Sequence, residues 1–455
     1  MITLLKKYIT KAGIDKAIFY TSLSRVVQSI GGLITVIFIA KYLTKIEQGF
    51  YFTFGSILAI QVFFELGLGG IITQYVAHEN AHLSWDKEQQ FTGESKYVSR
   101  LASLLRFCFK WYSILGFLLV FVLIIVGLIY FNKFYSSEEP VNWTIPWLLL
   151  CIGTTMNFLI APISAFISGL GRVKEIAQYR LWAQVVMMII IWSGLFFGAK
   201  LYVGGIASIV SAFLFFCYIL FSCNRKTIIT LWRVKVSERV QYMNEIFPYQ
   251  WKIALSWISG YFIFQLFNPV LFATEGAVIA GQMGMTLAAL NGIQSLSLSW
   301  MSTKVPLYSG LIAQNNYNAL DSIFNKTLKQ SVSITGFALL FMFVVIFIIR
   351  YFHIMIGKSD IGSRFLDYLP MILMMIPLFI NQFVNAWATH LRCHKQEPYL
   401  LISIVGGVLC CLSTILLGKY FGVIGVTAGY CLITICLMPW GYYIFKTKKE
   451  EWHGK

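Results

Sequence analysis

The stretch RVKEIAQYRLWAQVVMMIIIWSGLFFGAKLYVGG, residues 172–205, is followed 220 positions later by the related stretch RCHKQEPYLLISIVGGVLCCLSTILLGKYFGVIG, residues 392–425. Each copy has an arginine, a tyrosine seven residues later, an apolar run, a glycine and a second apolar run. The ungapped matches include Arg172/Arg392, Tyr179/Tyr399, Leu181/Leu401, Val185/Val405, Ser193/Ser413, Gly198/Gly418, Val203/Val423 and Gly205/Gly425. Self-similarity at a fixed shift predicts that the chain is built from two related halves.

The rest of the chain is as apolar as the repeat. Of its 455 residues, 58% are hydrophobic and only 12% are charged, and the mean hydropathy is +0.72. Apolar runs of about 20 residues have the length that crosses a bilayer, and in lipid they must be helical. The sequence therefore predicts an all-α polytopic membrane protein. The twelve runs fall near 17–43, 48–76, 112–131, 146–169, 176–198, 201–222, 250–272, 277–303, 331–349, 366–389, 399–418 and 422–445.

The repeat also predicts how the helices are arranged. A shift of 220 residues contains six runs, so both halves enter the membrane in the same direction, as parallel repeats do. At a shift of 232, Gly49 falls on Gly281, and each glycine opens the second span of its half. We expect a six-helix bundle at 1–222, a polar cytoplasmic linker at 223–245 and a second six-helix bundle at 246–455. Two such bundles around a central cavity are typical of alternating-access transporters.

Charge sets the orientation. An even number of spans places both termini on one side, and roughly three quarters of the 36 Lys and Arg then lie on that side, which the positive-inside rule makes cytoplasmic. The net charge of +17 is explained by this topology and by attraction to anionic lipids, so we expect membrane lipids and no nucleic acid as partners. The basic start MITLLKKYITKAGIDK lacks an A-x-A-like cleavage site and indicates an uncleaved first span.

Polar residues recur at helical spacing within several apolar runs. Such stripes avoid lipid and predict a hydrated cavity between the halves. They are Thr21, Arg25, Gln28, Gly32 and Thr35; Gln61, Glu65, Gly69 and Thr73; Lys252, Ser256 and Ser259; Asn291, Ser295 and Ser302; and Asn381, Asn385 and Thr389. From these stripes we take five candidate substrate-binding residues, Arg25, Gln28, Lys252, Asn291 and Asn385, and one candidate coupling residue, Glu65.

Arg25 and Glu65 have two interpretations each. Arg25 is the one cation that this assignment leaves within a span, and its guanidinium suits phosphate oxygens. Alternatively Arg25 and Glu65 pair with each other and lock the first hairpin. Glu65 is then a counter-ion, and otherwise a proton or cation site that couples to transport. Lys252 lies near the cytoplasmic end of its span, where it either faces the cavity or extends its ammonium to the interface.

Metal chemistry is not predicted. The segment 78–82, HENAH, matches the zinc motif H-E-x-x-H, but no third ligand follows it, and it lies at a cytoplasmic helix end. His390, Cys393 and His394 have ligand side chains at helical spacing without a fourth ligand nearby. The nine cysteines are scattered, mostly within apolar runs, as small buried hydrophobic residues are. We expect no metal, no cofactor and no catalytic residue.

Three segments, in this order, carry a family resemblance: KYLTKIEQGFYFTFGSILAIQVFFELGLGGIITQYVA at 41–77, AFISGLGRVKEIAQYRL at 165–181 and WMSTKVPLYSGLIAQNN at 300–316, which includes Pro306. With twelve spans, the whole chain resembles the polysaccharide-unit (O-antigen) flippases of the multidrug/oligosaccharidyl-lipid/polysaccharide exporter (MOP) superfamily. The resemblance implies flipping of an undecaprenyl-pyrophosphate-linked oligosaccharide to the periplasmic leaflet of the bacterial inner membrane, driven by a cation or proton gradient. It also implies a role in lipopolysaccharide or other surface-polysaccharide biosynthesis, with glycan polymerase and export machinery as partners.

Other functions stay open. A multidrug or cation antiporter of the same MATE-like fold would need acidic cavity residues, and Glu65 is the one deeply placed carboxylate that the sequence offers. A membrane-embedded polysaccharide-synthesis enzyme would need a long periplasmic loop, whereas the outer loops here are short. A scaffold without transport would leave the polar stripes unexplained. A peptidoglycan-precursor flippase would usually have extra spans and a cavity richer in arginine.

Overall fold

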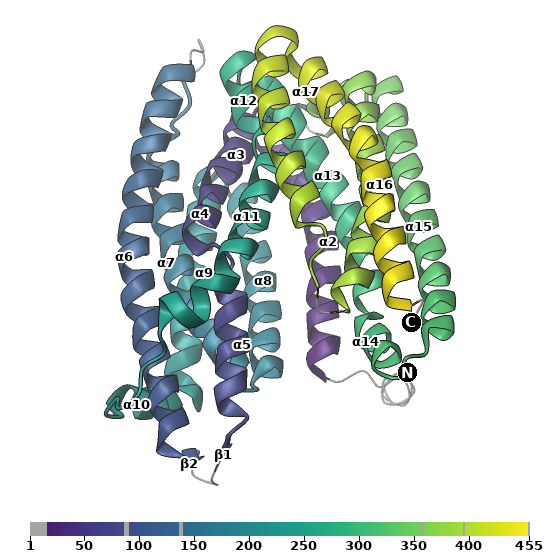
Figure 1. Cartoon of the computed structure of the whole chain (residues 1–455). Helices are drawn as coiled ribbons and strands as arrows, with labels where there is room; N and C mark the ends of the chain where they lie inside the picture. Colours follow the sequence, from purple (N-terminus) through teal and green to yellow (C-terminus); the bar gives the residue numbers. More distant parts are fainter. Residues whose placement is uncertain (1–15, 86–90, 136–139, 357–358, 395, 454–455) are drawn as a thin grey trace, which may run out of the picture.

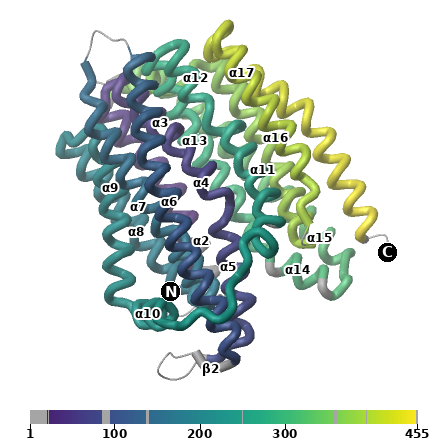
Figure 2. The backbone as a smooth tube through the Cα atoms, turned by 60° about the vertical axis from the view of Figure 1, so that its left-hand side comes forward, coloured from purple at the N-terminus to yellow at the C-terminus, as the bar shows by residue number. Residues whose placement is uncertain are grey.

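The computed structural model describes residues 16–85, 91–135, 140–356, 359–394 and 396–453. The predicted N-terminal cytoplasmic segment 1–15 lies outside these residues. Figure 1 shows the helices in two groups that diverge toward the end at which α2 (Lys16–Tyr42) begins and α17 (Leu400–His453) ends, and that converge at the opposite end. Figure 2 shows the same two groups from another side. The end at which the groups converge is called the outer end below, and the end at which they diverge is called the terminal end.

The first half holds the elements up to residue 221. They are α2 (Lys16–Tyr42), α3 (Lys45–Leu58), the 3-10 turn Ala59–Gln61, α4 (Val62–Glu65), α5 (Leu68–Asn80), the hairpin of β1 (Leu83–Trp85) and β2 (Phe91–Gly93), α6 (Ser95–Phe134), α7 (Thr144–Gly169), α8 (Val173–Phe196) and α9 (Tyr202–Phe221).

The linker and the second half follow. They contain α10 (Asn224–Arg233), the π-helical turn Tyr242–Ile246, α11 (Phe247–Phe264), α12 (Phe267–Thr274), α13 (Ala277–Ser302), α14 (Val305–Ala313), α15 (Tyr317–Tyr351), the short pair β3 (Met355–Ile356) and β4 (Ser359–Asp360), the 3-10 turn Gly362–Arg364, α16 (Tyr368–Arg392) and α17 (Leu400–His453).

The all-α membrane fold predicted from the apolar runs is confirmed, and each of the twelve runs has a helical counterpart. Nine helices within the described residues are long and apolar enough to span a membrane, and a bent pair, Lys45–Glu65 with Leu68–Asn80, passes the same test together. The last two runs merge into α17, where Gly422, at φ 55°, separates two helices. The seventh run is divided between α11 and α12.

The second run departs most from the expectation of an unbroken helix. Leu66 and Gly67 both have left-handed backbone angles, with φ of 48° and 69°, and the helix axis bends there by 41°. Glycine adopts this conformation without strain, whereas a side chain such as that of Leu66 pays for it. The break lies directly after Glu65 and exposes the amino-terminal turn of α5. Apolar patterning gives no sign of it.

The two glycines that the repeat aligns meet each other at the outer end. A Cβ atom on Gly49 would lie 1.9 Å from the Ala277 carbonyl oxygen, and one on Gly281 would lie 2.9 Å from the Gly49 amide nitrogen. No side chain fits between α3 and α13 here, so the backbones of the two halves touch. Aromatic side chains surround this contact, and Phe272 from the second half packs against Phe50 and Phe131 of the first.

The predicted linker lies along α6 at the terminal end. Arg106 donates to the Trp232 and Val234 carbonyls at 2.6 Å each. The Arg100 guanidinium forms ion pairs with Glu79 at 2.9 Å and with Glu245 at 2.5 Å. These contacts fasten the segment between the halves to the first half, close to where α11 begins.

Candidate functional site

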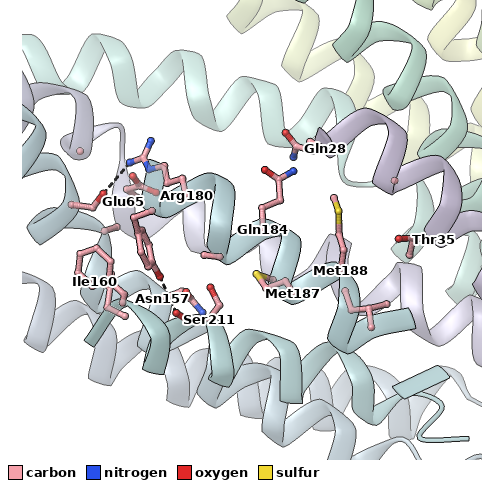
Figure 3. Close-up of a pocket in the computed structure, with 18 of the residues that line it drawn as sticks. Gln28, Thr35, Glu65, Asn157, Ile160, Arg180, Gln184, Met187, Met188 and Ser211 are labelled. Carbon is pink, nitrogen blue, oxygen red and sulfur yellow. Dashed lines mark hydrogen bonds between the residues drawn. The ribbon is translucent and has the colours of Figure 1, made fainter. Parts of the chain in front are cut away.

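A cavity of about 1030 Å³ lies within the first half (Figure 3). Side chains from α2, α5, α7, α8 and α9 form most of its wall, and the second half contributes Ala288. Its polar lining consists of Gln28, Thr35, Tyr51, Glu65, Thr73, Asn157, Ser164, Ser168, Tyr179, Arg180, Gln184 and Ser211. A space of this size, lined by amides, hydroxyls and two opposite charges, has the composition of a binding site for a polar ligand.

Helical spacing explains how α8 presents its face to the cavity. Arg180, Gln184 and Met188 follow each other at intervals of four residues, so they lie on one side of the helix. On α2, Gln28, Gly32 and Thr35 of the predicted polar stripe line the opposite wall. Figure 3 shows the Gln28 and Gln184 amides close together across the cavity. The side chain of Thr21, from the same stripe, lies outside the described part of the structure.

Glu65 enters the cavity from the helix break. It is the last residue of α4, and the first turn of α5, with Gly69 and Gly70, lines the cavity beside it. No hydrogen bond or ion pair joins its carboxylate to another described residue. The unsatisfied amides of a helix amino terminus favour negative charge, so the break gives the carboxylate a supporting electrostatic environment.

Arg180 is the cavity's cation. It comes from the second turn of α8 and donates one hydrogen bond to the Ser164 hydroxyl at 3.1 Å. Figure 3 shows Arg180 and Glu65 at the same end of the cavity, yet no ion pair within 4.0 Å joins them. The guanidinium has five N–H donors, so most of its hydrogen-bonding capacity is left for water or a ligand.

The remaining predicted site residues lie elsewhere. Arg25 donates to the Ser302 hydroxyl at 2.6 Å, and one turn on, the Ser29 and Ser295 hydroxyls are 2.8 Å apart. Both contacts join α2 of the first half to α13 of the second. Arg25 thus lies in the seam between the halves and forms no pair with Glu65.

Three predicted residues belong to the second half. Lys252 is exposed on α11, with its ammonium 5.7 Å from the Trp251 ring. Asn291 is exposed on α13 and borders a small gap that it shares with Asn381. Asn385 is half-buried on α16, and its carbonyl accepts a hydrogen bond from Thr389. The structure therefore brings Gln28 and Glu65 together in the cavity, but not Arg25, Lys252, Asn291 or Asn385.

Sequence reasoning missed Arg180, Gln184 and Asn157. Arg25 is not the one cation within the predicted spans, because Arg180 lies inside the run 176–198 and lines the cavity. Because Arg180 follows the start of that run closely, the charge pattern alone does not distinguish it from the cations of the preceding loop. The signal that was available is the four-residue interval between Arg180 and Gln184, which is the same stripe pattern found on the first span.

The His78–His82 segment is engaged in other contacts. The Glu79 carboxylate pairs with Arg100, and the His82 ring stacks on Tyr97 with ring centres 4.3 Å apart. In the second predicted cluster, His394 packs against Trp452 at 4.7 Å. Within the described ranges, no three His, Cys, Asp or Glu side chains are grouped closely enough to hold a metal ion.

No protein-family model matches the chain, and no curated protein matches it. Solved structures do. A multidrug resistance MATE family transporter of the MOP superfamily in an inward-facing conformation is 14% identical over 96% of this chain and 99% of that one, with a TM-score of 0.70. The chain shares its fold with this transporter structure.

Two further structures fit this fold less closely. The lipid II flippase MurJ in an inward closed conformation is 14% identical over 93% of this chain and 86% of its own, with a TM-score of 0.58. An outward-facing MATE family transporter of the MOP superfamily is 16% identical over 96% of both chains, with a TM-score of 0.57.

Proposed function

We propose that this protein is an alternating-access transporter that flips an undecaprenyl-pyrophosphate-linked oligosaccharide from the cytoplasmic to the periplasmic leaflet of the bacterial inner membrane. The observation that carries the proposal is the cavity in the first half. It presents an arginine with one neutral partner, amide and hydroxyl groups, and a carboxylate beside a broken helix.

The chemistry of the cavity matches the two parts of such a headgroup. Arg180 supplies a fixed cation with free N–H donors, which suits the oxygens of a pyrophosphate. Gln28, Gln184 and Asn157 line the same space with amide groups, and amides bind sugar hydroxyls as donors and as acceptors. Typical ligand sites have volumes of roughly 300–1,000 Å³, and the cavity, at about 1030 Å³, reaches the upper end of this range. It therefore has room for the pyrophosphate together with part of the sugar.

The orientation follows from the charge bias. With both termini in the cytoplasm, the terminal end faces the compartment in which the lipid-linked sugar is assembled, and the outer end faces the periplasm. The structural neighbour MurJ is described as a lipid II flippase, which is consistent with a lipid-linked substrate. We further propose that residues 1–222 and 246–455 form the two bundles and that residues 223–245 link them. Glycan polymerase and export machinery are the proposed partners.

Glu65 is the proposed coupling residue. A carboxylate in a membrane cavity without a basic partner binds a proton or a cation when one is supplied by a gradient. Protonation or cation binding at Glu65 changes the net charge that the cavity offers to an anionic headgroup. The driving ion and the substrate would then influence each other's affinity by the same factor.

A multidrug or cation antiporter is the second candidate, and the unpaired Glu65 carboxylate favours it. In that case Glu65 binds the cationic substrate directly, and Arg180 opposes its binding. The two candidates therefore make opposite predictions for Arg180. Removing its charge weakens transport of a phosphorylated substrate but leaves or improves transport of a cation.

The test uses the full chain in liposomes that contain a fluorescent undecaprenyl-pyrophosphate oligosaccharide, and follows its exposure to an impermeant quencher. Arg180→Ala should slow transfer about tenfold to a hundredfold, since one or two charged hydrogen bonds are lost. Lys174→Ala is the matched control, because Lys174 is an exposed cation on the same helix outside the cavity. Wild-type protein that leaves this lipid in place but expels ethidium would establish the antiporter instead.

A further inference from the structure

The outer end of the molecule contains a buried polar cluster that joins the two halves. It consists of Arg364, which closes the 3-10 turn Gly362–Arg364 of the second half, and Gln48 of α3 in the first half, with the backbone groups that they bind. We call this cluster the outer latch. It lies beside the contact between Gly49 and Gly281.

Arg364 reaches from the second half into the first. Its guanidinium donates to the Leu43 carbonyl at 2.7 Å and to the Gln48 side-chain oxygen at 3.3 Å. The residue is only 4% exposed, so these acceptors replace water at a charged group. Leaving such a group buried without its acceptors is costly, which makes the contact sensitive to any separation of the halves.

Gln48 bridges the halves in the opposite direction. It is 1% exposed, and its amide nitrogen donates to the Gly281 carbonyl at 2.8 Å and to the Arg364 carbonyl at 3.1 Å. Four hydrogen bonds of the latch therefore cross between the first hairpin and the second half. None of them can survive an opening of the outer end.

The loop that carries Arg364 is held separately within the second half. Arg350 donates to the Gly362 carbonyl at 2.9 Å and to the Phe365 carbonyl at 2.9 Å. Gln282 of α13 donates to the Ser363 carbonyl at 2.9 Å. Because these bonds stay within one half, they fix the loop in either state and leave Arg364 as the group that makes or breaks the crossing contact.

Burial and nearby carboxylates act in opposite directions on Arg364. Burial lowers the pKa of its guanidinium below the ordinary value, although the carboxylates of Glu47 and Asp360 oppose this effect. The side chain stays charged in the closed state because an arginine guanidinium does not lose its proton in proteins. When the outer end opens, water can take over the role of the Leu43 and Gln48 acceptors, so the latch is reversible and its net strength is modest.

We propose that Arg364 and Gln48 form a latch whose closure holds the outer end shut and whose release sets the equilibrium between this state and one open at the outer end. The inference rests on the alternating access of the proposed function. The four hydrogen bonds of the latch are then the ones that oppose opening of the outer end. A substrate or driving ion that shifts the equilibrium must overcome these bonds together with the packing of Phe272 against the first half.

Spin-label distances measured on the full chain in lipid nanodiscs test the latch without any substrate. One label pair is placed at the terminal end, on Ala81 and Asn315, and a second at the outer end, on Lys133 and Tyr420, all of which are exposed. The exposed cysteines 223 and 436 are replaced by serine beforehand. Arg364→Ala and Gln48→Ala are compared with Gln282→Ala, the control that removes a hydrogen bond from the same loop within one half.

We expect Arg364→Ala and Gln48→Ala to increase the population with a longer outer and a shorter terminal distance about tenfold, and Gln282→Ala to match wild type. If Arg364→Ala does not fold, Gln48→Ala decides alone. Distances that match the Gln282→Ala control in both latch variants would overturn the latch. A shift in the latch variants, with no transfer of the lipid-linked substrate by wild type, would support the latch and overturn the proposed substrate.

Discussion

The second span of each half occupies equivalent places in the repeat, yet the two are built differently. In the first half it is broken into α3, α4 and α5, and it bends by 41° after Glu65. In the second half it is the unbroken helix α13. The shift of 232 residues that aligns Gly49 with Gly281 also aligns Glu65 with Ser297.

The surroundings of these two residues differ as much as the helices do. Glu65 faces a large cavity without a hydrogen-bond partner among the described residues, whereas Ser297 is 1% exposed. The Ser297 hydroxyl accepts a bond from Thr335 at 2.8 Å, and its carbonyl accepts one from Ser331 at 3.1 Å. The polar groups of Ser297 are thus satisfied within the second half, whereas the Glu65 carboxylate of the first half is available for a ligand.

Glu65→Gln should have the largest effect on transport, because it removes the negative charge that Ser297 lacks and keeps the shape of the side chain. We expect the stimulation of transport by an ion gradient to fall at least about tenfold, within the range of typical coupling energies. Ser297→Ala should instead leave stimulation intact and reduce stability by about 1 kcal/mol, the usual value of one hydrogen bond. Transport in liposomes with imposed proton or sodium gradients, and thermal unfolding, measure the two effects.

Two other results would contradict this difference between the halves. Full stimulation in Glu65→Gln would mean that the free carboxylate does not couple. A loss of stimulation in Ser297→Ala, at unchanged stability, would mean that the second half contains a working site of its own.

Arg25→Ala comes next, since Arg25 lies in the seam between the halves and outside the cavity. Ser302→Ala removes the same hydrogen bond but keeps the charge. If the cation attracts the phosphorylated headgroup, Arg25→Ala should slow transfer about threefold to tenfold, and Ser302→Ala should have little effect. Equal losses in the two variants would assign Arg25 to holding α2 against α13. The quencher assay with the lipid-linked oligosaccharide distinguishes these results.

The sequence predicted the spans and the relation between the halves well, because both depend on properties that repeat along the chain. A run of apolar residues has to be a membrane helix, and Gly49 and Gly281 share a position in the repeat that the fold brings into contact. Neither conclusion needs knowledge of which helices are neighbours.

The site was harder to predict, because it depends on which helix faces which. Polar stripes show that Arg25, Gln28 and Glu65 avoid lipid, but not whether they turn to a cavity, a seam or each other. Arg180 was missed because it follows a loop closely. A cation near the start of a helix can lie at the membrane interface or in a cavity, and the sequence does not distinguish the two positions. The break after Glu65 depends on Leu66 as well as Gly67, and a left-handed leucine has no sequence signature.

Gly67→Ala tests the break itself through stability. Gly67 has φ 69°, and an added Cβ would lie 2.4 Å from the Ile253 side chain of α11. The left-handed conformation alone should lower stability by about 1–2 kcal/mol. Gly70→Ala, three residues on, is the control, because its Cβ meets no atom within 4 Å and alanine favours the helix. Thermal unfolding of both variants measures this, and an equally stable Gly67→Ala would show that the break is not strained.

The smallest expected effect concerns the linker, which fastens the start of α11 to the first half through Arg100 and Glu245. Partial burial raises the pKa of Glu245, but hydrogen bonds from Arg100 and from the Gln241 amide lower it by more. The net effect is a pKa below the ordinary value of 4.5. A lowered pKa in the folded state means that this carboxylate stabilises the protein above pH 4.5. That contribution is lost as the pH falls through the lower, folded-state pKa.

Glu245→Gln should therefore be less stable than wild type at pH 7, by at most about 1 kcal/mol for a partly exposed pair, and should lose less on acidification. Glu238→Gln, which removes a more exposed pair with Lys96 at 3.7 Å, is the control and should follow the wild-type pH profile. Thermal unfolding between pH 7 and pH 4 compares the three proteins. Parallel profiles for wild type and Glu245→Gln would mean that the linker is held instead by its backbone, whose amides donate to the Ser99 hydroxyl and whose carbonyls accept from Arg106. The joint between the halves would then not depend on this charge pair.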